Sequence, residues 1–166
     1  NQKEENLTEN IDSTSTIEDN NTQENSTPIT EETSQEEQSI EASSISSDIV
    51  ETAKSYLGYS YVSGGSSPSG FDCSGFTKYV YSQYGITLNR TAADQAENVT
   101  PINKEDLQTG DLLLFSYYGS SGFGHTGIYI GDGQFIHAAN SNRGVVTDTI
   151  ESGYYQENYI GARRLQ

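Results

Sequence analysis

The sequence of 166 residues lacks methionine and tryptophan and contains a single cysteine, Cys73. One cysteine excludes an internal disulfide framework, and in an exported protein it is either an intermolecular link or a reactive thiol. No apolar run approaches the roughly 18 residues of a membrane span. Neither an initiating methionine nor a charged-then-apolar leader is present. We therefore expect a processed or excised chain whose export signal has been removed.

Basic residues are also scarce, with 8 Lys and Arg against 24 Asp and Glu and a net charge of −16. Residues 1–48 contain 13 acidic residues, Lys3 as the sole base, and no glycine or aromatic residue. Such a segment cannot bury enough apolar surface to offset its chain entropy. We predict a disordered acidic tail over residues 1–48, either a spacer or a solvated leader, and one folded domain over residues 49–166. That domain has no basic stripe, so no nucleic-acid partner is expected.

Two stretches have the apolar spacing of amphipathic helices. Residues 49–57 follow possible N-cap residues at 46–48 and end at Gly58. The second helix is predicted to begin after Asp72, a good N-cap residue, and to end at Gly85, which suits the left-handed C′ position.

The C-terminal half favours an antiparallel sheet. Strands are predicted over residues 111–115, 125–130, 134–139, 144–150 and 159–163, after a possible short helix near residues 91–95. The segment Gly131-Asp132-Gly133 is a strong hairpin signal between the second and third of these strands. Helices that precede strands favour an α+β fold, with N-terminal helices packed on a small antiparallel sheet.

Cys73 stands at the predicted start of the second helix, where unpaired N–H groups and positive potential lower the pKa of a thiol. The thiolate is the attacking form of cysteine, and the same N–H groups could hold an oxyanion. Small Ser74 and Gly75 would let a substrate backbone come close. The alternative is that a lone cysteine is a small buried hydrophobic residue.

His125 and His137, the only two histidines, lie in the predicted hairpin. A three-residue loop over 131–133 would place His137 opposite Gly127. The two histidines would then be diagonal neighbours on one face, about 7–8 Å apart along the backbone. One imidazole could take the thiol proton while the other fixes its tautomer. A two-residue turn would put the imidazoles on opposite faces.

The opposite face of this hairpin carries Ile128, Ile130 and Ile136, which we expect to pack on the core. A zinc site at Cys73 and the histidines is an alternative that would need a fourth ligand such as Asp72 or Asp111. Paired ligand spacing is missing, so we predict no metal and no other cofactor.

Several short motifs follow one another along the folded part. They are Tyr61-Val62-Ser63-Gly64-Gly65, Phe71-Asp72-Cys73-Ser74-Gly75-Phe76, Arg90 with Gln95, Gly110-Asp111-Leu112-Leu113-Leu114-Phe115, Gly124-His125-Thr126-Gly127-Ile128-Tyr129-Ile130-Gly131 and Phe135-Ile136-His137-Ala138. Together they resemble the NlpC-type cell-wall cysteine peptidases over about residues 49–165. The resemblance implies a papain-like α+β fold, bacterial export and hydrolysis of peptidoglycan stem peptides, typically after γ-D-glutamate.

The resemblance also implies roles for the three central residues. By position Cys73 matches the nucleophile, His125 the general base and His137 the polar third member that orients it. Asn89 and Thr109 stand where the family often has a proline. Both positions lie in predicted turns, so these departures concern stability more than catalysis.

Five further positions match the family's pattern. Tyr61 matches a pocket tyrosine that can hydrogen-bond near the nucleophile, and Asp72 and Ser74 match positions that contact the peptide. Arg90 and Gln95 match recurring positions that we interpret as structural.

The sequence thus predicts a monomeric, secreted or wall-associated cysteine endopeptidase that needs no metal and whose partner is the peptidoglycan stem peptide. One alternative is an N-acetylmuramoyl-L-alanine amidase of the same fold. Another is a non-catalytic wall-binding module with the tail as spacer. Lipid-acting relatives of the fold place His before Cys, and the order here speaks against them. The third stem residue, diaminopimelate or lysine, stays open.

Overall fold

The computed structural model of the chain describes residues 31–97, 100–117 and 121–165. Its helices are α1 (Glu31–Ser55), α2 (Cys73–Ser82), α3 (Ala92–Gln95) and α4 (Gly153–Asn158), with a 3-10 turn η1 (Lys104–Asp106). Its strands are β1 (Ser66–Ser67), β2 (Gly70–Phe71), β3 (Thr100–Ile102), β4 (Leu112–Ser116), β5 (Phe123–Gly131), β6 (Gln134–Ala138), β7 (Val145–Thr149) and β8 (Tyr159–Arg164).

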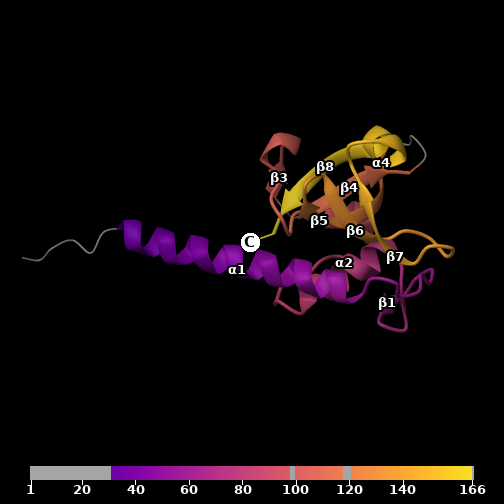
Figure 1. Ribbon diagram of the computed structural model, residues 1–166, viewed down its shortest axis with the longest axis horizontal. Coiled ribbons are helices and arrows are strands. Elements are labelled where there is room, and N and C mark those ends of the chain that lie inside the picture. Colours follow the sequence, from indigo (N-terminus) through magenta and orange to yellow (C-terminus); the bar gives the residue numbers. More distant parts are fainter. Residues whose placement is uncertain (1–30, 98–99, 118–120, 166) are drawn as a thin grey trace, which may run out of the picture. The chain divides into compact units, whose positions relative to one another are not determined.

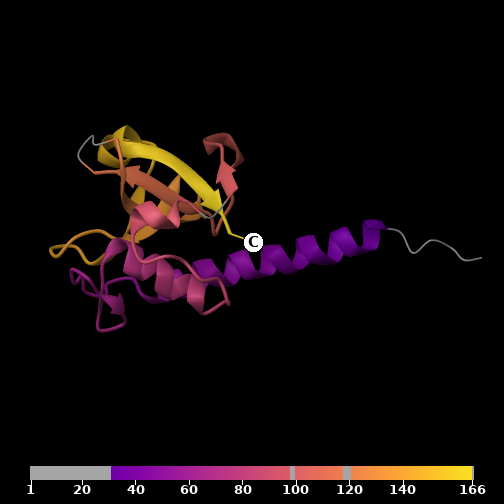
Figure 2. The same cartoon turned by 180° about the vertical axis from the view of Figure 1, so that it is seen from behind.

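The main sheet has the strand order β3-β8-β4-β5-β6-β7, and every neighbouring pair is antiparallel. β1 and β2 form a separate two-stranded ribbon just before α2. Figures 1 and 2 both show α1 and α2 on the same side of this sheet. The predicted α+β fold, with N-terminal helices packed on an antiparallel sheet, is confirmed, although β1 and β2 precede α2 and α4 lies between β7 and β8.

The hairpin of β5 and β6 has the predicted register, although its turn is shorter than predicted. Ile128 pairs with Ile136, whereas at the turn Gly131 pairs with Gln134, so only Asp132 and Gly133 lie between the paired ends. A register shift between Tyr129 and Gly131 leaves one more residue on β5 than on β6, which is the pattern of a β-bulge. The bulge therefore keeps both histidines on one face despite the two-residue turn.

Alternation along the strands gives the sheet two apolar faces. One face packs against α1 and α2 through Ile49, Ala53, Phe71, Phe76, Val80, Leu112, Leu114, Ile128 and Ile136. The other face carries a second cluster of Leu113, Phe115, Phe135, Ile150 and Ala162, with Tyr155 of α4 packed against it. The prediction that the isoleucine face of the hairpin packs on the core is confirmed, whereas α4 was not predicted.

The structure differs from the predicted disordered tail over residues 31–48, which it describes as part of α1. Ile45 and Ile49 lie four residues apart on one face of this helix, and both pack against the core. The hydroxyl of Tyr84 donates to the carbonyl of Asp48 (2.9 Å) and also hydrogen-bonds Thr52. These contacts give a polar segment the tertiary support that its composition alone does not provide.

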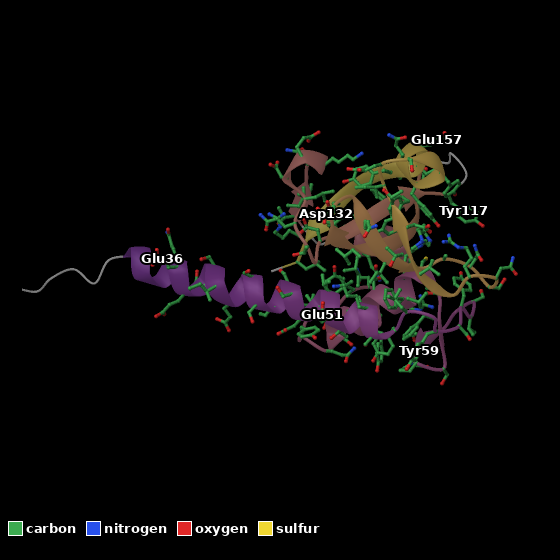
Figure 3. All side chains as sticks on the ribbon, viewed as in Figure 1. Glu36, Glu51, Tyr59, Tyr117, Asp132 and Glu157 are labelled. Atoms are coloured by element: carbon green, nitrogen blue, oxygen red, sulfur yellow. The ribbon has the colours of Figure 1, made fainter. Side chains whose placement is uncertain are left out.

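Residues 35–44 of α1 are exposed. Ile40 is 69% exposed. Figure 3 shows Glu36 toward the outer end of α1 and Glu51 where the helix runs beside the rest of the fold. The remainder of the predicted tail, residues 1–30, lies outside the described residues.

Candidate active site

Cys73 is the first residue of α2, as predicted, and Asp72 is the N-cap. The Oδ1 atom of Asp72 accepts the main-chain N–H of Gly75 (2.7 Å), and its Oδ2 atom accepts that of Gly64 (3.1 Å). Asp72 therefore satisfies one of the free N–H groups of the first turn and ties the loop before β1 to the helix start. The Cys73 side chain is partly buried there.

Close packing of the backbone requires a glycine at position 75. A Cβ at this position would lie 2.0 Å from the carbonyl oxygen of Gly65. That oxygen accepts the main-chain N–H of Asp72 (2.9 Å), so it is fixed by the cap. The structure thus gives Gly75 a packing role, room for the loop at Gly65, while room for an approaching substrate backbone stays a prediction.

We expect Gly75→Ala to lower the free energy of unfolding by about 1–3 kcal/mol, the usual cost of overpacking a site that cannot relax. Urea unfolding measures the change. Gly122→Ala is the matched control, because a Cβ at Gly122 meets nothing within 4 Å. Equal stability of the two variants would contradict this account of Gly75.

The thiol of Cys73 has a raised pKa, contrary to the predicted lowering. Burial raises the pKa of Cys73, and the carboxylate of Asp72 adds to the effect. The main-chain N–H groups of Ser74 and Thr126 act in the opposite direction without reversing it. The helix start thus supplies N–H groups, but its N-cap places a negative charge beside the sulfur. Cys73 consequently rests as a thiol and needs a base to become a nucleophile.

The two predicted histidines form the middle of a hydrogen-bonded chain. Nε2 of His125 lies 2.7 Å from Nδ1 of His137, and Nε2 of His137 lies 2.8 Å from Oδ2 of Asp148. Arg143 donates to both oxygens of Asp148, at 2.6 Å and 3.0 Å. His125 is 8% exposed and His137 is fully buried. The structure therefore brings the imidazole pair together as predicted and adds a carboxylate and a guanidinium.

Burial makes both imidazoles resist protonation. It lowers the pKa of His125 to about 3, with His137 as a second cause and Asp148 partly opposing. Burial also lowers the pKa of His137, against the hydrogen bond to Asp148. Both rings are therefore neutral at pH 7.

This burial predicts a loss of stability in mild acid. The unfolded chain protonates His125 near pH 6.5, whereas the folded chain does so only near pH 3. Because the folded pKa is depressed, the contribution to stability is complete above about pH 6.5 and falls as the pH drops toward 3.

Between about pH 7.5 and about pH 5, the wild type should lose about 2 kcal/mol more unfolding free energy than His125→Gln. Urea unfolding at the two pH values measures the difference. An identical pH dependence in both proteins would show that His125 is not held neutral in the folded state.

Main-chain contact joins the sulfur to the histidine strand. Thr126, whose N–H acts on the Cys73 sulfur, directly follows His125 in β5. Tyr61 is close enough to Cys73 for the thiol to raise its pKa, after burial as the larger cause. The predicted nucleophile, base strand and pocket tyrosine are thus brought together.

Tyr155 of α4 is a site residue that the sequence reasoning missed. Its ring meets that of His137 edge-on, with centroids 4.9 Å apart, and lies 5.9 Å from that of His125. Burial raises the pKa of Tyr155, and the charges of Asp148 and Cys73 add to the effect. The ring of Tyr155 packs over the imidazole pair and shields it from solvent.

Asp72 and Ser74, the predicted peptide contacts, are held by Arg90. The guanidinium donates to both oxygens of Asp72, at 3.0 Å and 2.5 Å, and to Oγ of Ser74 at 3.0 Å. The Asp72 side chain is 15% exposed, so it remains partly accessible to solvent. Gln95 is buried. Its side chain accepts a hydrogen bond from the hydroxyl of Thr77 (2.8 Å) and donates one to the main-chain carbonyl of Ser74 (2.9 Å), in keeping with a structural role.

Within the described ranges, no group of three or more His, Cys, Asp or Glu side chains is arranged to hold a metal ion. The two aspartates considered as a fourth zinc ligand both pair with arginines, Asp72 with Arg90 and Asp111 with Arg164. In the same part of the chain, no helix is both long and apolar enough to span a bilayer.

A cysteine at the start of a helix, beside an antiparallel sheet that carries a buried imidazole pair, defines a papain-like α+β domain. A family model described as the NlpC/P60 family matches residues 58–164. The chain belongs to the NlpC/P60 family.

Two curated relatives show how far the similarity extends. A gamma-D-glutamyl-L-lysine dipeptidyl-peptidase of Bacillus cereus is 42% identical over 118 residues, which cover 70% of this chain and 35% of the relative. A gamma-DL-glutamyl hydrolase of Bacillus subtilis is 43% identical over 120 residues, which cover 70% of this chain and 29% of the relative. The chain thus spans about a third of the length of these two relatives.

Solved structures agree with the fold. An NlpC/P60 family protein from Bacillus cereus has a TM-score of 0.69 and 41% identity, covering 72% of this chain and 39% of that chain. The NlpC/p60 domain of the peptidoglycan hydrolase SagA has a TM-score of 0.64 and 36% identity, covering 72% of this chain and 98% of that chain.

Proposed function

We propose that this chain is a cysteine peptidase that cleaves peptidoglycan stem peptides at the γ-D-glutamyl–diamino acid bond. The observation that carries the proposal is the position of Cys73, the only thiol, against the strand that bears one imidazole of a buried hydrogen-bonded pair. The names of two relatives, a γ-D-glutamyl-L-lysine dipeptidyl-peptidase and a γ-DL-glutamyl hydrolase, support a γ-glutamyl substrate.

The proposed reaction has two halves. The sulfur of Cys73 attacks the carbonyl carbon of the scissile amide while its proton passes to His125. The C–N bond then breaks, the proton moves to the departing amine, and a thioester remains on Cys73. Water, deprotonated by His125, attacks the thioester and releases the carboxylic acid and the thiol. Main-chain N–H groups at the start of α2 hold the oxyanion in both halves.

Cys73 and His125 are both uncharged before the reaction, and this determines when the proton moves. A raised thiol pKa and a lowered imidazole pKa keep both partners neutral before attack. Charge separation in a buried site is costly unless it is compensated. The proton therefore leaves sulfur as the new S–C bond forms, when the oxyanion donors can share the negative charge.

The peptide-binding side of the site is proposed to lie at the start of α2. Tyr61, Asp72 and Ser74 line it, and Arg90 fixes the last two in place. We propose a supporting role for Arg90 here, because its hydrogen bonds to Asp72 and Ser74 already occupy the guanidinium. The expected location is secreted or wall-associated, where peptidoglycan is found, and the expected state is a monomer.

Digestion of defined muropeptides, followed by mass spectrometry of the products, tests the proposal. Cleavage after γ-D-glutamate releases a fragment that begins with the diamino acid. An amidase would instead release the whole stem peptide from the sugar, and a wall-binding module would release nothing. Substrates that differ only in diaminopimelate or lysine at the third stem position define which diamino acid is accepted.

A further inference from the structure

The hydrogen-bonded chain of the two imidazoles ends at the carboxylate of Asp148, which is held in turn by Arg143. Asp148 lies on β7, beside the strand of His137, and Arg143 in the preceding loop binds both of its oxygens. The side chain of Asp148 is 22% exposed, and that of Arg143 is 43% exposed. Burial raises the pKa of Asp148, but the hydrogen bonds from His137 and Arg143 outweigh it, so this pKa lies well below its ordinary value. Asp148 is therefore ionised and can only accept hydrogen bonds.

The ionised carboxylate determines where each imidazole carries its proton. Because Oδ2 of Asp148 can only accept, Nε2 of His137 must be the N–H in their 2.8 Å contact. His137 is neutral, so its Nδ1 atom carries a lone pair and accepts. Nε2 of His125 must then be the donor in the 2.7 Å contact between the rings. The unprotonated atom of His125 is consequently Nδ1.

We propose that Asp148, held by Arg143, is a positioning residue that fixes the tautomers of both histidines and leaves Nδ1 of His125 as the base atom. The inference rests on the proposed function, since it names the atom that takes the Cys73 proton.

The same carboxylate also supplies the charge that the reaction needs. When His125 takes the thiol proton, the buried pair becomes positive, and Asp148 is the anion hydrogen-bonded to it through His137. An adjacent carboxylate stabilises such a transient imidazolium without itself becoming protonated. Arg143 holds the carboxylate in place through two hydrogen bonds, and its positive charge lowers the pKa of His137.

Besides Cys73 on α2, whose sulfur lies beside β5, the titratable and charged groups in and around the pair come from four elements. They are His125 on β5, His137 on β6, Asp148 on β7 with Arg143 before it, and Tyr155 on α4. Tyr155 stays neutral because burial raises the pKa of its phenol. The titration of the pair therefore depends on Asp148, which favours its protonation, and on Arg143, which opposes it.

Nitrogen-15 NMR of the histidine rings tests the tautomers directly. The chain has only two histidines, so labelling histidine gives four ring nitrogens. At neutral pH both Nε2 atoms should be protonated and both Nδ1 atoms unprotonated. A proton on Nδ1 of either ring overturns the proposal.

Arg143→Gln provides a second measurement that does not need activity. Removing the guanidinium removes the charge that lowers the pKa of His137. The pH at which the His137 ring nitrogens titrate should therefore rise relative to the wild type. An unchanged titration overturns the role given to Arg143.

Kinetics of muropeptide cleavage test the positioning role. Asp148→Asn should lower kcat by roughly 10–100-fold, the scale known for carboxylates that orient metal-bound histidines, with little change in KM. Asp148→Glu restores the charge and should recover part of kcat. Glu157→Gln is the matched control, because it makes the same carboxyl-to-amide change at an exposed site on α4 (Figure 3). A kcat of Asp148→Asn equal to that of the control contradicts the proposal.

These results separate the inference from the proposed function. If the wild type cleaves no muropeptide while both Nε2 atoms carry protons, the proposed function fails and the tautomer assignment holds. If the wild type cleaves muropeptides while a Nδ1 atom carries a proton, the proposed function holds and this inference fails. Thermal unfolding of each variant establishes that it is folded when it is assayed.

Discussion

Replacing Cys73 with serine or alanine should lower the rate of muropeptide cleavage by at least about 10⁴-fold, the scale seen when a nucleophile that acts with its base is removed. Serine keeps the size of the side chain, but its hydroxyl is far less acidic than a thiol, and His125 is a weak base in this buried site. The measurement is kcat/KM on a defined muropeptide.

Two controls accompany the Cys73 variants. The urea unfolding curve should match that of the wild type within about 1 kcal/mol, because Cys73 is only partly buried. Addition of a chelator should leave the wild-type rate unchanged, since the proposed steps use no metal. Full activity of Cys73→Ser would refute the nucleophile assignment.

His125→Gln should reduce kcat/KM by at least about 10³-fold at pH 7, because the thiol then has no base. The raised pKa of Cys73 makes the thiolate scarce at pH 7, which increases the expected loss. In the variant only the spontaneously ionised fraction of Cys73 can attack. Its residual rate should therefore rise about tenfold per pH unit. Because the pKa of Cys73 is raised, this rise should continue past about pH 8.5, the ordinary pKa of a thiol.

The pH profile of His125→Gln distinguishes loss of a base from loss of structure. His137→Gln is the comparison, because it removes the orienting ring and leaves the base, and it should cost less activity than His125→Gln. A residual rate in His125→Gln that does not change between pH 7 and 9 would contradict the role of His125 as the base.

Local patterns were sufficient to predict the parts of the site that local rules control. Asp72 is a capping residue and Cys73 follows it, which fixes the helix start without any distant contact. The alternation of apolar residues around Gly131 to Gly133 determines the register, since a one-residue slip would expose the isoleucines. A bulge compensated for the two-residue turn, so the prediction of a shared histidine face holds for a different reason than expected.

The parts that were not predicted depend on pairings between distant segments. Asp148 reaches His137 only because β7 pairs with β6 in the register that sets Phe135 opposite Asp148. The loop before β7 gives no sequence signal for that register. Tyr155 lies on a short helix without strong apolar periodicity, and it is positioned by the second apolar cluster rather than by its own segment.

The sign of the thiol pKa shift shows why position alone did not predict reactivity. A helix start lowers a thiol pKa through its N–H groups, and the structure has these groups. Burial and the Asp72 carboxylate outweigh them. The residue that starts the helix is thus the one that opposes ionisation of the thiol.

Thiomethylation of Cys73 tests the central claim most directly. A methanethiosulfonate reagent adds only a small group, and because the chain has one cysteine, intact mass gives the modified fraction without ambiguity. Muropeptide cleavage should fall in proportion to that fraction, reach zero at full modification and return when a reductant removes the group. Cleavage that persists in fully modified protein would contradict the assignment of Cys73 as the nucleophile.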